Sequence, residues 1–188
     1  MNSNNIDFDP DERLALAQWY IDQNRLDNAL AEIKGLLDDK ANSQITLTAA
    51  RLYAQLRLFE RAQKLFQQYL EQNPNSTNAR FQLGMSQFDN GEAEQALDTW
   101  QHLLAAQPEN PPALFYSALA RLQRGESGEA ESMLHTILHH THRDNLYYGK
   151  ASDLLDQIRL EPNRIQAANE SLAEVDNKAG KNHYETEH

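Results

Sequence analysis

Apolar residues recur at three- and four-residue spacing along most of the chain, which predicts amphipathic helices rather than strands. The helices are expected in pairs, because four alanines recur at separations of 33, 34 and 34 residues and each has a second apolar stretch just before it. These are Ala29, Ala62, Ala96 and Ala130. A fixed period of this length indicates stacked two-helix units rather than one globular core.

The residues around the four alanines repeat as well. Four residues after each alanine stands a large apolar residue: Ile33, Phe66, Trp100 and Leu134. Twelve residues before each stands a small one: Ala17, Ala50, Gly84 and Ala118. Small residues are needed where two packed helices cross at short distance. The recurrence therefore reflects a structural repeat and not a common residue met by chance.

On these residues the chain resembles tetratricopeptide repeat proteins, whose units are helix-turn-helix modules of 34 residues. Further matches to the family pattern are Tyr20, Tyr53, Pro74 and Pro108. The resemblance implies an all-α fold, a right-handed α-solenoid of about four repeats with a capping helix. Departures are Gln87 and Arg121 in place of the family's tyrosine and Ala41 and His142 in place of its closing proline.

The expected organisation follows from this register. It comprises a lead-in at 1–9, repeats at 10–42, 43–76, 77–110 and 111–144, a capping helix at 145–160 and a polar tail at 161–188. The capping helix is predicted from Tyr148, Ala151, Leu155 and Ile158, which share one helical face. In the tail, 163–175 has apolar residues at helical spacing, and the last dozen residues lack the apolar content to offset ordering.

Local signals support the helix boundaries. Asp9-Pro10-Asp11-Glu12 predicts a helix start, with a capping acceptor, proline in the first turn and acids at the positive helix end. Asn110-Pro111 repeats this arrangement. Gly91 and Gly125 are expected in the turns between paired helices, where glycine adopts a positive φ without steric penalty.

Charge and composition limit the classes of partner that the chain is expected to bind. With 17 basic and 28 acidic residues the formal charge is −11, which disfavours nucleic acid and anionic membranes. No apolar run approaches the ~18 residues of a membrane span, and the opening residues lack signal-peptide character, so we expect a cytoplasmic protein. The absence of cysteine excludes disulfides, thiolate–metal sites and cysteine nucleophiles.

No enzyme signature is present in the sequence. Ser117 and Ser132 lack a glycine-flanked elbow, and there is neither a glycine-rich phosphate loop nor a His-Glu-x-x-His pair. We therefore expect no catalytic activity and no cofactor. A weak metal candidate is His135, His139 and His142, which would share a stripe if one helix continued through all three. The favoured interpretation is that these histidines lie at an exposed helix end and complement its dipole.

The resemblance implies that recognition takes place on a concave groove lined by the first helix of each pair. The predicted groove residues are Phe81, Gln82, Met85, Phe88, Phe115, Tyr116, Leu119, Leu122 and Arg51. Seven of them are apolar and predict a hydrophobic patch toward the C-terminal half. The lysine- and asparagine-rich carboxylate clamp of chaperone-binding family members is absent, so we expect a hydrophobic or amphipathic segment of a partner protein.

Two functions of different class follow. The first is an adaptor or chaperone-like module that holds such a segment, as bacterial secretion chaperones and cytochrome-assembly factors of the family do. The second is a homo-oligomeric scaffold assembled through the ends of the stack, with the groove covered by its own tail. The groove side chains could alternatively pack against neighbouring helices and leave little exposed surface.

Overall fold

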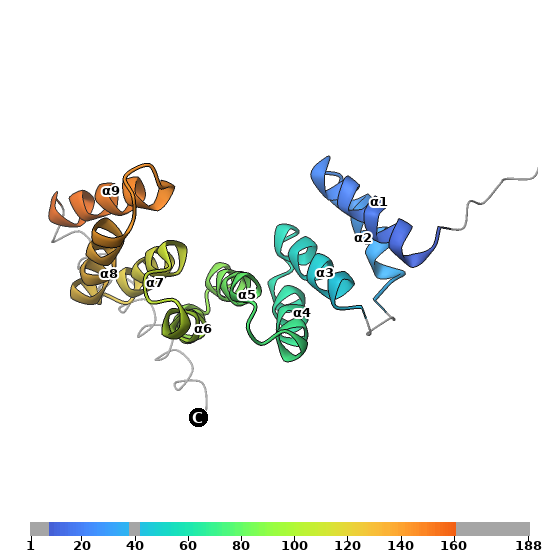
Figure 1. Cartoon of the computed structure of the whole chain (residues 1–188), viewed down its shortest axis with the longest axis horizontal. Coiled ribbons are helices and arrows are strands. Elements are labelled where there is room, and N and C mark those ends of the chain that lie inside the picture. The colour runs from blue at the N-terminus through green and yellow to red at the C-terminus, as the bar shows by residue number, and fades with distance from the viewer. Residues whose placement is uncertain (1–7, 38–41, 161–188) are drawn as a thin grey trace, which may run out of the picture. The chain divides into compact units, whose positions relative to one another are not determined.

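The computed structural model describes residues 8–37 and 42–160, and these residues form helices and connecting turns (Figure 1). The helices are α1 (Pro10–Asp22), α2 (Leu26–Lys34), α3 (Ser43–Gln55), α4 (Phe59–Gln72), α5 (Thr77–Asp89), α6 (Ala93–Ala106), α7 (Pro111–Gln123), α8 (Ser127–His140) and α9 (Leu146–Leu160). The chain divides into two compact units, Met1–Thr99 and Trp100–His188, and the division falls within α6. We call them the N-terminal unit and the C-terminal unit.

The helices begin where short polar side chains cap them. Asp9 and Glu12 form a reciprocal capping box at α1, with the Glu12 amide donating to Asp9 Oδ1 at 2.9 Å. Asn42, Ser76 and Asn110 cap α3, α5 and α7 through their side-chain oxygens. The predicted helix starts at Asp9-Pro10 and Asn110-Pro111 are confirmed.

The turns within the helix pairs share one geometry. One residue in each adopts a positive φ: Asn24, Arg57, Gly91 and Gly125. The amide of the next residue donates to the carbonyl oxygen five residues earlier, which satisfies a carbonyl group at the helix end. The two glycines confirm the prediction, whereas Asn24 and Arg57 accept a conformation that costs most L-residues about 1–2 kcal/mol.

In the N-terminal unit, α1 pairs with α2 and α3 with α4. Helix α3 also packs on α1 and α2, and α5 packs on α3 and α4. The shared core contains the small residues Ala17, Ala29, Ala50 and Ala62, all fully buried, with Phe66 beside them. These alanines leave the space in which the large side chains of the neighbouring helix pack.

In the C-terminal unit, α7 pairs with α8, and α9 packs on both. Its core includes Ala118 and Ala130 from the helix pair and three residues from one face of α9, namely Ala151, Leu155 and Ile158. The other side of α9 exposes Asp153, Asp156 and Gln157. A helix with one apolar and one polar face is what a terminal cap requires.

Candidate functional site

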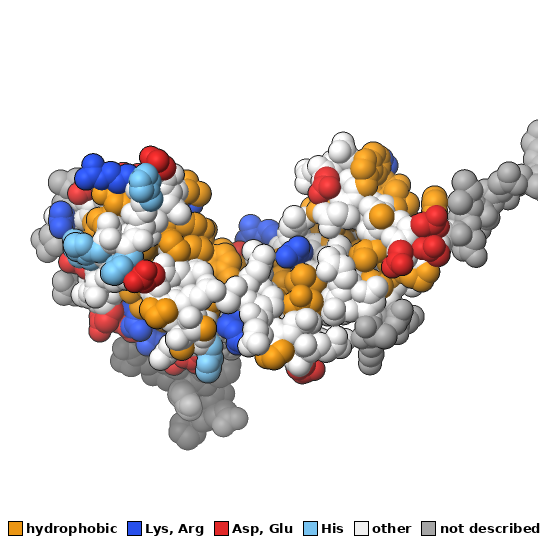
Figure 2. Space-filling model, in the orientation of Figure 1, with side chains coloured by type: hydrophobic (Ala, Val, Ile, Leu, Met, Phe, Trp, Pro, Cys, Tyr) orange, Lys and Arg blue, Asp and Glu red, His pale blue; other side chains and the backbone are white. Residues whose placement is uncertain are grey.

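The predicted groove residues of the N-terminal unit lie on α3 and α5. Phe81, Gln82, Met85 and Phe88 are half-buried on α5, and Arg51 is exposed on α3. Phe81, Met85 and Phe88 follow the i, i+4, i+7 spacing of one helical stripe, so they share one side of α5. Partial exposure of this stripe leaves apolar area at the surface of the unit. Figure 2 shows hydrophobic side chains among the polar ones at the surface of each unit.

Polar contacts fix the C-terminal end of α5. Gln63 on α4 donates through Nε2 to Glu92 Oε2 at 2.7 Å and to the Ser86 carbonyl oxygen at 3.4 Å. Thr99 donates from its hydroxyl to Gln87 Oε1 at 2.7 Å. These part-buried hydrogen bonds fix the C-terminal end of α5, which carries Met85 and Phe88, against α4 and the first half of α6.

The predicted groove residues of the C-terminal unit divide into two classes. Phe115 and Leu122 are only 8% exposed and belong to the hydrophobic core. Tyr116 and Leu119 are half-buried and pack at the edge of the same core. The expectation that all four side chains line an open surface therefore needs correction: α9 packs on α7, and Phe115 contacts Tyr147 of α9 at 5.8 Å between ring centroids.

An aromatic cluster in the C-terminal unit was missed by the sequence analysis. The Tyr116 ring lies 6.1 Å from Trp100, 5.6 Å from Phe115 and 6.4 Å from Tyr147. Lys150 Nζ lies 5.7 Å from the Phe115 ring centroid and 5.5 Å from that of Tyr147, within the range of cation–π attraction. Extending the 34-residue register by one unit onto α9 would have placed Lys150 at the same repeat position as Tyr116.

The position of Tyr147 affects its ionisation. Burial, and after it the neighbouring Tyr116, raises the pKa of Tyr147 above the ordinary value of 10.0. The phenol therefore stays neutral at physiological pH. The cluster provides an apolar surface with one nearby cation, Lys150.

The weak metal candidate is wrong. Helix α8 ends at His140, and Thr141 has extended dihedral angles, so His142 lies beyond the helix and does not continue its stripe. His142 Nδ1 instead lies 3.2 Å from Asp144 Oδ2, and both side chains are almost fully exposed. Among the described residues no group of three metal-binding side chains converges.

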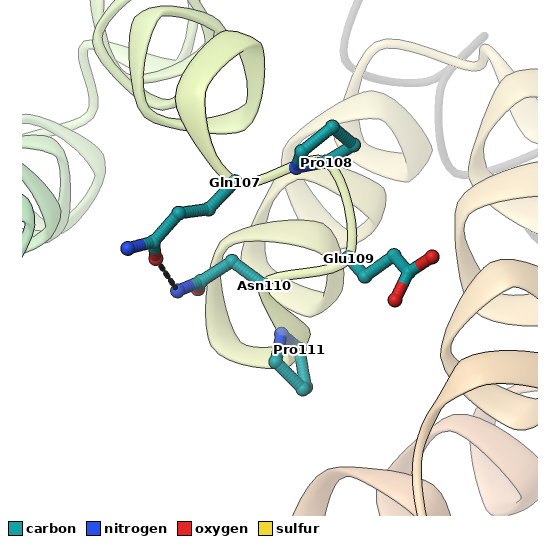
Figure 3. A pocket seen from close by; sticks show the side chains of 5 residues that line it. All are labelled: Gln107, Pro108, Glu109, Asn110 and Pro111. Atoms are coloured by element: carbon teal, nitrogen blue, oxygen red, sulfur yellow. Dashed lines mark hydrogen bonds between the residues drawn. The ribbon is translucent and has the colours of Figure 1, made fainter.

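A shallow hollow of about 430 Å³ lies at the turn between α6 and α7, lined by Gln107, Pro108, Glu109, Asn110 and Pro111 (Figure 3). Asn110 Nδ2 donates to Gln107 Oε1 at 2.9 Å, and Glu109 lies 2.9 Å from His140 Nδ1 of α8. These contacts satisfy the turn's own polar groups. The hollow has the lining of a helix-capping turn and not of a catalytic site.

Two further expectations concern the tail and membrane insertion. The predicted helical segment at 163–175 and the rest of the tail lie outside the described residues. Within the described ranges, no helix is long and apolar enough to cross a membrane.

Residues 57–111 match the family model of the tetratricopeptide repeat. The chain contains tetratricopeptide repeats. No curated protein matches the sequence. The matched range begins at Arg57 in the turn between α3 and α4 and ends at Pro111, the first residue of α7.

Solved structures of MamA are similar to this repeat chain. MamA MSR-1 has a TM-score of 0.67 at 22% identity, covering 73% of this chain and 79% of its own. MamA AMB-1 has a TM-score of 0.64 at 24% identity, covering 70% of this chain and 78% of its own. At this identity the likeness concerns the fold, and it confirms the predicted all-α repeat class.

The repeats support a general role in protein interaction, because this fold presents surfaces to other proteins. The boundaries assigned to individual repeats, the groove residues and the lack of catalytic activity stay predictions.

Proposed function

We propose that this chain is an adaptor that holds a hydrophobic or amphipathic segment of a partner protein on the first helices of its pairs, with α3 and α5 considered in the N-terminal unit and α7 in the C-terminal unit, each unit by itself. The observation that carries the proposal is the half-buried apolar stripe of Phe81, Met85 and Phe88 on α5. A partner that covers such a stripe gains roughly 25 cal/mol for each Å² of apolar surface removed from water. Tyr116 and Leu119 offer a second, smaller apolar surface on α7.

Polar groups beside the apolar surfaces would set the direction of the bound segment. Gln82 lies next to the α5 stripe, and Arg51 on α3 is an exposed cation. In the C-terminal unit, Lys150 is a cation beside the aromatic cluster. An amphipathic segment with acidic residues beside its apolar face suits both units better than a purely apolar one.

The two buried residues change the predicted contact set. Phe115 and Leu122 support α7 and α9 from within the core, so their substitution would test folding and not recognition. We therefore assign contact roles to Phe81, Gln82, Met85, Phe88, Tyr116, Leu119 and Arg51.

Site-specific photo-crosslinking tests this proposal. A photoreactive phenylalanine analogue at position 85 or 119 should capture a partner in cells, and mass spectrometry should locate the adduct on a hydrophobic or amphipathic segment. The same analogue at Gln67, exposed on the second helix α4, is the matched control. Met85→Glu with Leu119→Glu should reduce the yield of co-purified partner by at least about tenfold, since a buried unpaired carboxylate costs more than 1.4 kcal/mol.

Circular dichroism of the double variant separates loss of binding from loss of folding. A well-folded Met85→Glu, Leu119→Glu chain that still captures the same partner would refute the groove assignment. Adducts that form equally from Gln67 would do so as well.

A further inference from the structure

The outward side of α1 differs from the same side of the later first helices. Three residues of each helix share repeat positions on this side: Glu12, Leu16 and Trp19 on α1, Ile45, Ala49 and Leu52 on α3, and Ala79, Leu83 and Ser86 on α5. The α3 and α5 residues are all buried. On α1, by contrast, Glu12 is exposed, Leu16 is half-buried and Trp19 is 50% exposed.

The difference has a simple cause. Helix α3 is packed against α1 and α2, and α5 against α3 and α4, so the preceding pair covers this side of each. Among the described residues no helix pair precedes α1. Its core-facing residues, Leu14, Ala17, Tyr20 and Ile21, pack within the unit. Leu16 and Trp19 therefore face a side that no described helix covers.

Arg25 lies near this surface, beside the Tyr20 ring that neighbours Trp19. The Trp19 and Tyr20 rings lie 5.2 Å apart between centroids, and the Arg25 guanidinium carbon lies 4.9 Å from the Tyr20 ring centroid. Arg25 forms no ion pair with any described residue, and neither does Asp11 in the first turn of α1. An unpaired cation therefore lies near the end of this surface and an unpaired carboxylate near its beginning.

We propose that the outer stripe of α1, Leu16 and Trp19, together with Arg25 in the turn after the helix, binds the same surface of a second copy of the chain across a two-fold axis. In an antiparallel arrangement Leu16 lies against Trp19 of the second copy, and Arg25 then lies near Asp11 of the second copy. The two helix dipoles oppose each other, which is favourable. An isologous contact of this kind uses one self-complementary patch twice and closes as a dimer.

Within the described residues, the outer side of α9 carries Asp153, Asp156 and Gln157, which offer no apolar contact to Trp19. The exposed apolar residue of this helix, Leu146, lies at its first position. Head-to-tail growth through α1 and α9 is therefore disfavoured. The proposed contact is independent of the groove residues on α5 and α7.

Sedimentation velocity over a range of concentrations tests the proposal on the full chain. The wild-type mass should rise with concentration from 21.5 kDa toward twice that value. Trp19→Glu should hold the mass at that of the monomer, because its carboxylate would be buried against Leu16 of the second copy. Leu146→Glu is the matched control, since Leu146 is an exposed apolar residue at the other end, on α9.

Charge reversal tests the antiparallel pairing itself. Asp11→Arg and Arg25→Glu should each weaken dimerisation by roughly two- to thirtyfold, because each substitution changes both symmetry-related ion pairs of the dimer. An equal mixture of the two variants should recover wild-type affinity, because each pair of opposed residues again carries opposite charges. Recovery in the mixture requires contact between copies and does not follow from altered folding of either variant.

Several results would overturn the proposal. They are a wild-type chain that stays monomeric, a dimer that Trp19→Glu leaves intact, a mixture that fails to recover affinity, or dimerisation that appears only after residues 1–7 are removed. Loss of the dimer on Met85→Glu in a folded chain would place the contact on the groove and would likewise contradict it. Failure of the groove proposal leaves these measurements unaffected.

Discussion

The first helix, α1, and the last described helix, α9, differ in the side chains on their outer sides. Helix α9 turns Leu155 and Ile158 inward and aspartates outward, whereas α1 turns Leu14 and Ile21 inward but keeps Trp19 half-exposed on its outer side. A helix that only ends a stack needs a polar outer face. The contrast supports the proposal that the outer side of α1 is a contact surface.

The strongest test of this contrast removes the inner face of α9. Leu155→Ala should destabilise the chain by about 2–4 kcal/mol, because Leu155 is buried against α7 and α8 and its loss leaves a cavity. Chemical denaturation followed by circular dichroism measures the change. Trp19→Ala, on the outer side of α1, should cost far less under conditions where the chain is monomeric.

The control for this experiment is Asp153→Ala, on the exposed side of α9. It should change the free energy of unfolding by less than about 0.5 kcal/mol. A cost similar to that of Leu155→Ala would show that the outer side of α9 is also packed, and the contrast between the two ends would disappear.

A smaller effect is expected in the turns, where the first two helix pairs have Asn24 and Arg57 at positive φ and the later two have Gly91 and Gly125. Gly91 has a φ of 83° and open space around the position of an added Cβ, so Gly91→Ala should cost about 1 kcal/mol from backbone strain alone. Arg57 already holds a φ of 58°. Arg57→Gly should therefore raise the midpoint of thermal unfolding or leave it unchanged.

Calorimetry on both variants checks the turn prediction. Equal destabilisation by Gly91→Ala and Arg57→Gly would mean that the cation–π contact of Arg57 with Phe59, at 5.7 Å, outweighs its backbone strain.

The smallest effect concerns the aromatic cluster at alkaline pH. Because the pKa of Tyr147 is raised in the folded chain, its contribution to stability is complete below pH 10 and declines as pH rises through the raised pKa. Thermal midpoints measured on both sides of pH 10 should fall less for Tyr147→Phe than for wild type. An identical fall in both proteins would assign the alkaline loss to other groups.

Most of the fold was predictable because the same residue types recur at the same positions of four repeats. The period alanines Ala29, Ala62, Ala96 and Ala130 are all fully buried, and Gly91 and Gly125 have the positive φ expected of them. Such positions depend on contacts within one helix pair, where sequence spacing determines geometry. Capping at Asp9 and Asn110 is local in the same way.

The candidate site was less predictable because exposure depends on helices that lie elsewhere in the sequence. Phe115 and Leu122 have the repeat positions of groove residues, yet the C-terminal unit buries both. His142 left the predicted stripe because α8 stops at His140. Arg57 in a left-handed conformation has no sequence signal, since arginine seldom adopts that conformation.

The two tryptophans give the molecule a pair of intrinsic optical probes. Trp19 belongs to the N-terminal unit and is half-exposed to solvent. Trp100 is the first residue of the C-terminal unit and is fully buried. Unfolding of the C-terminal unit should shift the emission of Trp100 to longer wavelength, whereas Trp19 already emits from a polar environment. Fluorescence can therefore report on that unit without any introduced label.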